Sequence, residues 1–164
     1  MTVIVVMGVS GSGKTTVGTA VAARLGVDYA EADTFHPPAN IAKMTAGHPL
    51  TDEDRAPWLA AIAKWIGEHR ESGGVVSSSA LKRSYRDVLA GGGDVWFLHL
   101  HGDRGLLAER MKHRSGHFMP VSLLDSQLAD LEPLQRDEPG RTFDLAKSPA
   151  ELVDAALTAF RERA

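Results

Sequence analysis

The chain has 164 residues, a typical length for one domain, and its 43% hydrophobic and 24% charged residues exclude disordered, collagen-like and coiled-coil proteins. Its 18 Lys and Arg residues and 21 Asp and Glu residues leave a formal charge of −3, so we expect no general nucleic-acid binding. Cysteine is absent, which excludes disulfides, thiolate metal sites and cysteine nucleophiles, and we expect a protein of the reducing cytoplasm.

The first predicted element is a strand at residues 3–7, a short run of apolar, mostly β-branched side chains. Such a run is typical of a strand buried on both faces of a parallel sheet, so we expect it at the centre. It is far shorter than the ~20 residues of a membrane span, and no basic segment precedes it, so neither a membrane anchor nor a signal peptide is expected. Residues 15–25 then predict an amphipathic helix that ends at Gly26.

Strands and helices alternate along the rest of the chain. Further strands are predicted at residues 28–32, 75–79, 95–100 and 142–145. Further helices are predicted at residues 40–46, 51–70, 81–89, 104–112, 123–131 and 149–163. Thr51 and Ser148 have the character of N-caps for two of these helices. The alternation predicts an α/β fold in which helices cover both faces of a parallel sheet, with residues 1–164 forming a single domain.

A glycine-rich segment follows the first strand and opens the first helix. Residues 8–15 match the complete G-x-x-x-x-G-K-[ST] phosphate-loop pattern, in the strand-to-helix context that the pattern requires. Backbone N–H groups and the helix N-terminus can surround phosphate oxygens, Lys14 can reach the β and γ phosphates, and the Thr15 hydroxyl can bind Mg²⁺. The predicted nucleotide-binding residues are Gly8, Ser10, Gly11, Ser12, Gly13, Lys14, Thr15 and Thr16.

The class of nucleotide-binding protein follows from what accompanies this loop. The N-K-x-D pattern with which GTPases read guanine is absent from the sequence. The predicted third strand ends in Ser77, Ser78 and Ser79, with no acidic residue to act as a Walker B aspartate, and the chain is short for a motor or an AAA-type module. The remaining class is that of the small P-loop kinases, which bind ATP and a small acceptor.

The acceptor site is expected at the carboxyl ends of the strands, because open α/β sheets bind ligands at that edge. Asp33 follows the second strand, and a carboxylate there can orient an acceptor hydroxyl and take its proton. Capping of the next turn is the alternative role for Asp33. His36 can hydrogen-bond a polyol, or it can be a structural residue of the loop before Pro37 and Pro38.

Two groups of cations can bind an anionic acceptor. Arg55 stands among acidic residues at the start of a predicted helix, where it either binds a carboxylate or serves as the counterion of its neighbours. Lys82, Arg83 and Arg86 follow the third strand at the ligand edge, where they bind the acceptor or form an ordinary solvated face. Residues 82–114 hold seven Lys or Arg against four Asp or Glu, so positive charge is concentrated where two anions would meet.

A lid is predicted around residues 110–125. Arg110 and Arg114 stand four residues apart at the end of a predicted helix, so they can share one face. Closed over ATP, they would stabilise the charge that develops on the transferred phosphoryl group. We assign His117 of the same segment to the acceptor site rather than to a metal, because Gly116 separates it from His113 and no carboxylate motif accompanies the pair.

Taken together, these segments resemble the gluconate kinases (gluconokinases) of the small P-loop type over nearly the whole chain. Beside the phosphate loop, the distinctive combination is F-H-P at residues 35–37, D-E-D-R-A-P-W at residues 52–58, S-A-L-K-R-S-Y-R-D at residues 79–87, and G-H-F-M at residues 116–119 with S-Q at residues 126–127. The departures are small: Ala32 stands where the family usually has glycine, and Ser78 where a cysteine is common.

The resemblance implies a P-loop NTPase fold of the nucleoside-monophosphate-kinase and shikimate-kinase type, and commonly a homodimer. It also implies ATP-dependent phosphorylation of D-gluconate at its 6-hydroxyl, which gives 6-phospho-D-gluconate for the pentose phosphate or Entner–Doudoroff route. In that reaction Lys14 holds ATP and Asp33 activates the acceptor hydroxyl. Two alternatives stay open: a kinase for another small anionic acceptor such as shikimate, and a regulatory module that binds ATP without transfer.

Overall fold

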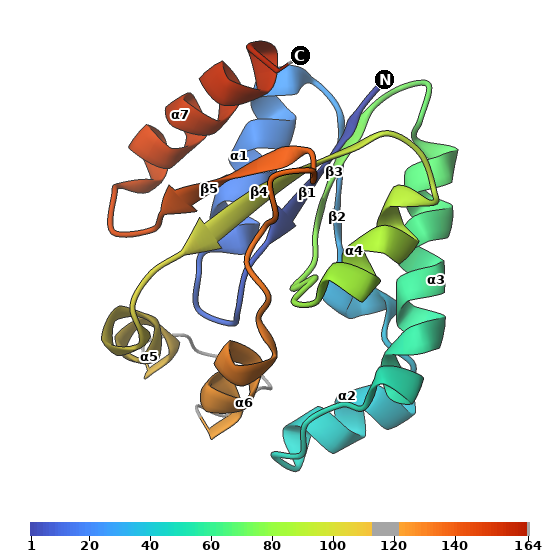
Figure 1. The fold of residues 1–164 in the computed structure, drawn as a ribbon, viewed down its shortest axis with the longest axis vertical. Helices are drawn as coiled ribbons and strands as arrows, with labels where there is room; N and C mark the ends of the chain where they lie inside the picture. Colours follow the sequence, from blue (N-terminus) through green and yellow to red (C-terminus); the bar gives the residue numbers. More distant parts are fainter. Residues whose placement is uncertain (113–121, 164) are drawn as a thin grey trace.

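The computed structural model describes residues 1–112 and 122–163. Within these residues a five-stranded sheet runs in the order β2-β3-β1-β4-β5, and every neighbouring pair is parallel. The strands are β1 (Val3–Met7), β2 (Asp28–Glu31), β3 (Gly74–Ser77), β4 (Val95–His101) and β5 (Gly140–Asp144). The helices are α1 (Lys14–Leu25), the 3-10 helix η1 (Ala32–Phe35), α2 (Pro38–Thr45), α3 (Asp52–Glu68), α4 (Arg83–Ala90), α5 (Arg104–Lys112), α6 (Ser122–Asp130) and α7 (Pro149–Arg161). The predicted α/β fold is confirmed, with β1 at the centre of the sheet (Figure 1).

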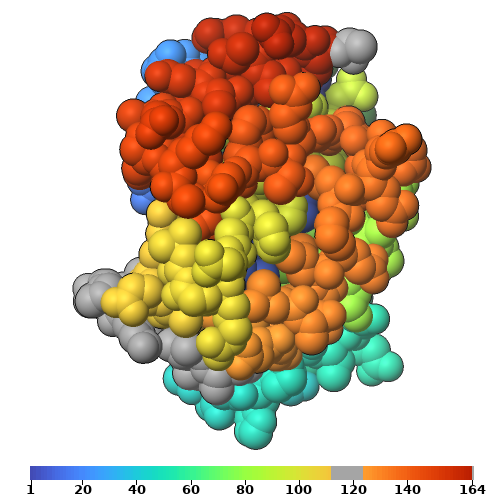
Figure 2. Space-filling view, turned by 60° about the vertical axis from the view of Figure 1, so that its left-hand side comes forward, coloured from blue at the N-terminus to red at the C-terminus, as the bar shows by residue number. Residues whose placement is uncertain are grey.

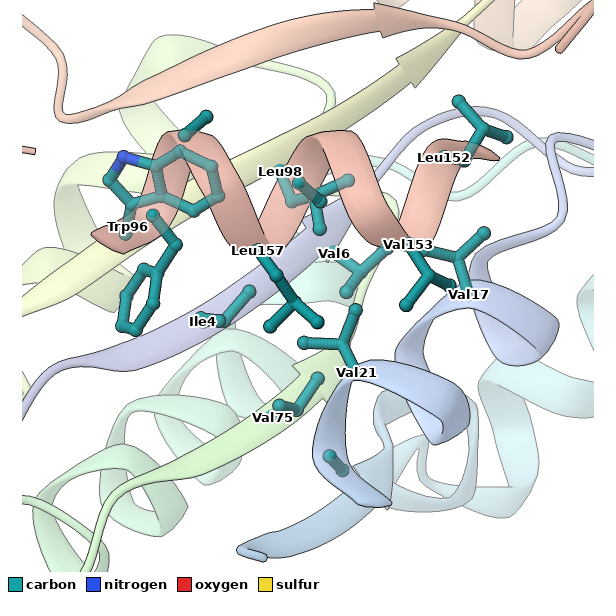
Figure 3. Close-up of a cluster of buried hydrophobic side chains, with 14 of the residues drawn as sticks. Ile4, Val6, Val17, Val21, Val75, Trp96, Leu98, Leu152, Val153 and Leu157 are labelled. Atoms are coloured by element: carbon teal, nitrogen blue, oxygen red, sulfur yellow. The ribbon is translucent and has the colours of Figure 1, made fainter. Parts of the chain in front are cut away.

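Successive side chains of β1 point to opposite faces of the sheet. Ile4 and Val6 pack against α1 and α7, and Figure 3 shows Val21 of α1 and Leu157 of α7 converging on this face. The other residues of β1 pack against α3 and α4 on the opposite face. The residues of the continuous apolar run are therefore buried on both faces of the sheet, as the sequence pattern predicts for a central strand.

A third apolar cluster lies beyond the carboxyl ends of the strands, where α5 and α6 pack against the phosphate loop. Gly11 of this loop has a φ of 84°, and a Cβ atom on it would come within 2.9 Å of Met111 Cγ and 3.0 Å of the Leu107 carbonyl oxygen on α5. A glycine at this position therefore lets α5 close on the loop. In Figure 2, atoms of the N-terminal segment (blue) are visible between the yellow residues around α5 and the orange residues that include α6.

The predicted N-caps at Thr51 and Ser148 are confirmed. Thr51 Oγ1 accepts a hydrogen bond from the Asp54 backbone N–H at 3.1 Å, and Asp54 Oδ2 accepts one from the Thr51 N–H at 2.9 Å. Ser148 and Glu151 form the same reciprocal pair at the start of α7. Such capping boxes satisfy backbone donors that the first turn of a helix leaves unpaired. In the described part of the chain no helix combines the length and the apolar character needed to cross a membrane.

The helix predicted at residues 81–89 starts two residues later than expected. Ala80 has a φ of 44°, a left-handed conformation that is uncommon for alanine, and Lys82 is the extended N-cap of α4. Residues 78–82 consequently form a loop at the carboxyl edge of the sheet instead of the first turn of a helix.

Arg86 of α4 holds this loop from inside the protein. Its side chain is fully buried and donates from Nε and Nη2 to the two carboxylate oxygens of Glu138, at 2.6 and 3.0 Å. Its Nη1 donates to the carbonyl oxygens of Ala80 and Leu81, at 2.9 and 3.3 Å. The assignment of Arg86 to the acceptor site is corrected to a structural role, because Glu138 neutralises its charge and its donors are used inside the protein.

We expect Glu138→Ala to lower the free energy of unfolding by about 3–5 kcal/mol, because the guanidinium of Arg86 would stay buried without an opposite charge. Urea denaturation followed by circular dichroism measures this loss. Asp137→Ala is the matched control, since Asp137 pairs with Arg83 at the surface, where an ion pair contributes about 1 kcal/mol or less. Equal losses for the two variants would contradict the structural role of Arg86 and Glu138.

Candidate active site

A pocket opens at the carboxyl ends of β1, β2 and β3. Its walls come from the phosphate loop, the segment from β2 to α2, the start of α3 with the loop before it, the loop after β3, and α6. The lining residues are Ser10, Lys14, Thr15, Glu31, Asp33, His36, Met44, Pro49, Leu50, Arg55, Trp58, Ser79, Leu81, Ser126 and Gln127. The pocket therefore brings together the predicted phosphate site and the predicted acceptor residues Asp33, His36 and Arg55.

The phosphate loop leads into α1 through Gly13, which has a φ of 90° and is the N-cap of the helix. The Lys14 ammonium donates to the carbonyl oxygens of Gly8 and Val9, at 2.9 and 3.1 Å, so it lies over its own loop. Together with the loop N–H groups and the N-terminus of α1, it places positive charge where phosphate oxygens would bind. The other predicted nucleotide-binding residues stand on the loop or in the first turn of α1: Ser10, Gly11, Ser12, Thr15 and Thr16.

Arg110 of α5 lies next to this loop. Its Nη2 donates to the Leu145 carbonyl oxygen at 2.8 Å, and its Nη1 lies 3.7 Å from where a Cβ atom on Gly13 would be. A guanidinium in this position can contact bound phosphates. The second predicted lid cation, Arg114, and the predicted acceptor residue His117 lie outside the described residues, as does most of the predicted lid.

Thr15 bonds to Glu31, an acidic residue for which the sequence pattern predicts no role. Thr15 Oγ1 donates to Glu31 Oε2 at 2.8 Å, and the Tyr29 hydroxyl donates to the same oxygen at 2.7 Å. A hydroxyl and a carboxylate fit Mg²⁺, which takes one or two protein oxygens beside those of substrate phosphates. Within the described residues no cluster of three or more His, Asp or Glu side chains could hold a metal ion alone. The position of Glu31 at the end of β2, two residues before Asp33, is the signal that could have identified it.

Asp33 and His36 stand on and just after η1. Within the described residues the Asp33 carboxylate makes no capping hydrogen bond, so the alternative role as a cap is not observed. His36 is buried and stacks flat on Trp58, with ring centroids 4.3 Å apart and planes inclined by 11°. Burial lowers the pKa of His36 to about 4, so the ring is neutral at pH 7.

Arg55 supplies positive charge on the acceptor side of the pocket. It is buried near the start of α3, and its Nη1 donates to the Leu50 carbonyl oxygen at 3.1 Å and to the Tyr85 hydroxyl at 2.9 Å. In the described part of the chain its nearest carboxylate is that of Asp130, with 3.9 Å between Nη1 and Oδ2. The guanidinium is therefore only weakly neutralised, and its planar fork suits the carboxylate of an acceptor.

The acidic residues that surround Arg55 in the sequence pair with other groups. Asp54 accepts from Lys43 at 2.6 Å, and this bond is the main cause that lowers the pKa of Asp54 to about 2. Asp52 accepts from Lys82 at 3.2 Å and from the Tyr85 hydroxyl, which itself accepts from Arg55. The Tyr85 bond is the main cause that lowers the pKa of Asp52, and the charge of Arg55 adds to it without a direct ion pair. The place of Arg55 in the pocket lining favours acceptor binding as a further role.

The cation cluster after β3 does not line the pocket. Lys82 is not among the lining residues and pairs with Asp52. Arg83 turns to the other side, where Nη1 and Nη2 donate to the two carboxylate oxygens of Asp137 at 2.9 and 3.1 Å. Because α4 begins only at Arg83, its first turn meets residues 132–138 and not the pocket. The position of Arg83 therefore does not support the predicted contact with the acceptor.

Gln127 of α6 bonds to the phosphate loop across 117 positions of sequence. Its Oε1 accepts from the Ser10 backbone N–H at 2.7 Å, and its Nε2 donates to Ser10 Oγ at 3.2 Å. These two bonds hold the loop in place at Ser10. In the sequence, Gln127 stands out only as part of a segment shared with the gluconate kinases, because nothing in its local pattern indicates this distant partner.

The model of the shikimate kinase family matches residues 10–154. The gluconokinase of Gluconobacter oxydans is 49% identical over 161 residues, and the match covers 96% of this chain and 90% of that protein. The thermosensitive gluconokinase of Escherichia coli is 47% identical over 137 residues, which cover 82% of this chain and 73% of that protein. Both relatives span most of the described fold.

Solved structures of kinases are similar to this chain as well. A gluconokinase from Sinorhizobium meliloti matches with a TM-score of 0.90 at 51% identity, covering 98% of this chain and 91% of that chain. A shikimate kinase from Aquifex aeolicus matches 96% of this chain and 95% of its own with a TM-score of 0.66; at 15% identity this likeness concerns the fold alone. This chain therefore belongs to the gluconokinases, within the shikimate kinase family of P-loop proteins.

Proposed function

We propose that this protein is a gluconokinase, which transfers the γ-phosphoryl group of ATP to the 6-hydroxyl of D-gluconate and yields ADP and 6-phospho-D-gluconate. The observation that carries the proposal is a single pocket lined by the phosphate loop, the carboxylate of Asp33 and the buried guanidinium of Arg55. These three groups correspond to the phosphoryl donor, the reacting hydroxyl and the carboxylate of gluconate. Membership of the gluconokinases supports the same substrate pair.

On the nucleotide side, the loop N–H groups and the Lys14 ammonium bind the β and γ phosphates of ATP. The Thr15 hydroxyl and the Glu31 carboxylate would hold Mg²⁺, which neutralises charge on the phosphate oxygens when it is bound. Arg110, and with it Arg114, stabilises the negative charge that develops on the transferred group. This side of the pocket therefore acts mainly by positioning and by electrostatic stabilisation.

On the acceptor side, Arg55 binds the carboxylate of gluconate and His36 contacts its hydroxyl groups. Asp33 accepts the proton of the 6-hydroxyl as that oxygen bonds to the γ-phosphorus, while the bond to the bridging oxygen breaks and ADP leaves. Trp58 and Leu50 give the pocket apolar walls, which reduce the access of water as a competing acceptor.

We further propose a cytoplasmic homodimer whose product enters the pentose phosphate or Entner–Doudoroff route. The absence of cysteine suits a reducing compartment, and the family resemblance is the basis for the dimer. Light scattering coupled to size-exclusion chromatography tests the dimer directly, since a monomer would elute with half the expected mass.

ADP release coupled to a spectrophotometric readout tests the proposed reaction, with gluconate, other aldonates and shikimate as acceptors. We expect gluconate to be preferred over shikimate by roughly a hundredfold or more in kcat/KM, because shikimate lacks the open polyol chain. A preference for shikimate would indicate the other kinase activity. ATP binding without turnover of any acceptor would indicate a regulatory module.

We expect Asp33→Asn to lower kcat by about 10²- to 10⁴-fold, because an amide cannot accept the proton of the reacting hydroxyl. The affinity for ATP, measured by calorimetry, should not change, since Asp33 lies on the acceptor side. Asp28→Asn, an exposed change at the other end of β2, is the matched control and should keep the rate of the unmodified protein. A variant Asp33→Asn of normal kcat would remove Asp33 from the mechanism.

We expect Arg55→Met to raise KM for gluconate by about ten- to a hundredfold, the loss of a hydrogen-bonded ion pair of about 1.5–3 kcal/mol. The KM for ATP should stay constant. Arg83→Met also removes one arginine charge but acts outside the pocket, so we expect its KM for gluconate to stay near that of the unmodified protein. Steady-state kinetics with each substrate varied in turn measure both KM values. An equal rise of KM for gluconate in both variants would contradict the assignment of Arg55 to the carboxylate of gluconate.

A further inference from the structure

His36 is held between Trp58 and Asn40 at the wall of the pocket. Its ring stacks on the indole of Trp58, and its Nδ1 lies 3.2 Å from the side-chain nitrogen Nδ2 of Asn40, a buried residue of α2. Only 8% of His36 is exposed, and the residue lines the pocket. Within the described residues its Nε2 has no hydrogen-bond partner and is not closed off from solvent, so this nitrogen is open to the pocket.

The contacts of Asn40 decide which nitrogen of His36 carries the ring proton. Nδ2 of Asn40 also lies 2.8 Å from the backbone carbonyl oxygen of Asp54. A carbonyl oxygen can only accept, so the Asn40 atom that faces it is the NH₂ nitrogen, which donates two hydrogens and accepts none. Its second hydrogen is available to Nδ1 of His36, and Nδ1 must then be the unprotonated nitrogen. The ring proton consequently sits on Nε2.

We propose that Asn40 is a positioning residue that holds His36 in the Nε2–H tautomer, so that the ring presents one fixed donor to an oxygen atom of the polyhydroxy acid in the pocket. The inference rests on the proposed function and names the group that orients its acceptor. A hydroxyl that donates its proton to Asp33 still has lone pairs, and the Nε2–H of His36 can donate to one of them. The opposite tautomer would present a lone pair and would compete with Asp33 for the hydroxyl proton.

The tautomer matters because the His36 ring is neutral and has only one N–H donor. Burial is the main cause that lowers the pKa of His36 to about 4; the negative charge of Asp33 raises this pKa, and the positive charge of Arg55 lowers it. At pH 7 the ring therefore carries a single hydrogen, and the hydrogen bond at one nitrogen selects the function of the other.

The first measurement is ¹⁵N NMR of the full chain labelled with ¹⁵N-histidine, at pH 7. The spectrum of His36→Gln identifies the signals of His36 among those of the seven histidines. We expect Nδ1 to have the chemical shift of an unprotonated nitrogen and Nε2 that of a protonated one. A protonated Nδ1 would overturn the proposal. The measurement needs neither gluconate nor a variant of Asn40, so its outcome is independent of the proposed function.

The second measurement compares Asn40→Asp with a control on the same helix. The introduced carboxylate only accepts, so we expect Nδ1 to become protonated and KM for gluconate to rise roughly five- to tenfold at constant KM for ATP. Lys43→Met is the control, because Lys43 also bonds to Asp54, at 2.6 Å, but not to His36. It should change neither the tautomer nor KM for gluconate.

A double variant separates the tautomer from a merely structural role of Asn40. The amide donor of glutamine cannot change tautomer, so Asn40→Asp added to His36→Gln should change KM for gluconate by less than about twofold. An equal rise in both backgrounds would show that Asn40 acts only through the local structure, and would overturn the proposal. Absence of gluconate turnover in the unmodified protein would overturn the proposed function and the identification of the ligand as a polyhydroxy acid. The NMR result would still decide which tautomer His36 adopts.

Discussion

The pocket depends on the parallel register of β1, β2 and β3. Val6 of β1 and Glu31 of β2 both stand opposite Ser77 of β3, so the three strands end within one residue of the same level. The segment that follows each strand therefore leaves the sheet at one edge: the phosphate loop after β1, η1 after β2 and residues 78–82 after β3 (Figure 1). A slip of one residue in this pairing would move every side chain of a strand to the other face. The register thus places the donor site beside the acceptor site.

Burial and pairing give the arginines of this region different roles. Arg86 is buried against Glu138, and Arg83 pairs with Asp137, so the protein neutralises both charges itself. Arg55 is also buried, but its nearest described carboxylate is 3.9 Å away. A buried charge without a close partner is unfavourable, and the carboxylate of a ligand would neutralise the charge of Arg55 by forming an ion pair with it. The distribution of opposite charges, and not the number of cations in the sequence, therefore identifies the arginine that can bind an anion.

The sequence predicts those features whose causes lie within a few neighbouring residues. The phosphate loop, the central strand and the two capped helices each follow from a short local pattern, and the structure confirms the elements. Contacts across long distances have no local cause: Gln127 reaches Ser10 over 117 positions, and Arg86 reaches Glu138 over 52. The direction in which the Arg86 side chain points also depends on the residue at which α4 begins. The positive φ of Ala80 helps to set that residue. Intrinsic propensity does not predict that conformation for an alanine.

The two roles left open for His36 by the sequence, structural residue and polyol ligand, are compatible in the structure. Stacking on Trp58 and the bond from Asn40 fix the ring and use one of its nitrogens, while the other remains open to the pocket. Burial keeps the ring neutral, which also matters for Asp33, since a positive charge on the ring would attract the negative charge of that carboxylate and weaken it as a proton acceptor. Among the described residues that line this side of the pocket are the cation Arg55, the carboxylate of Asp33 and the neutral ring of His36. This set matches a ligand with a single carboxylate, one reacting hydroxyl and further hydroxyls to be oriented.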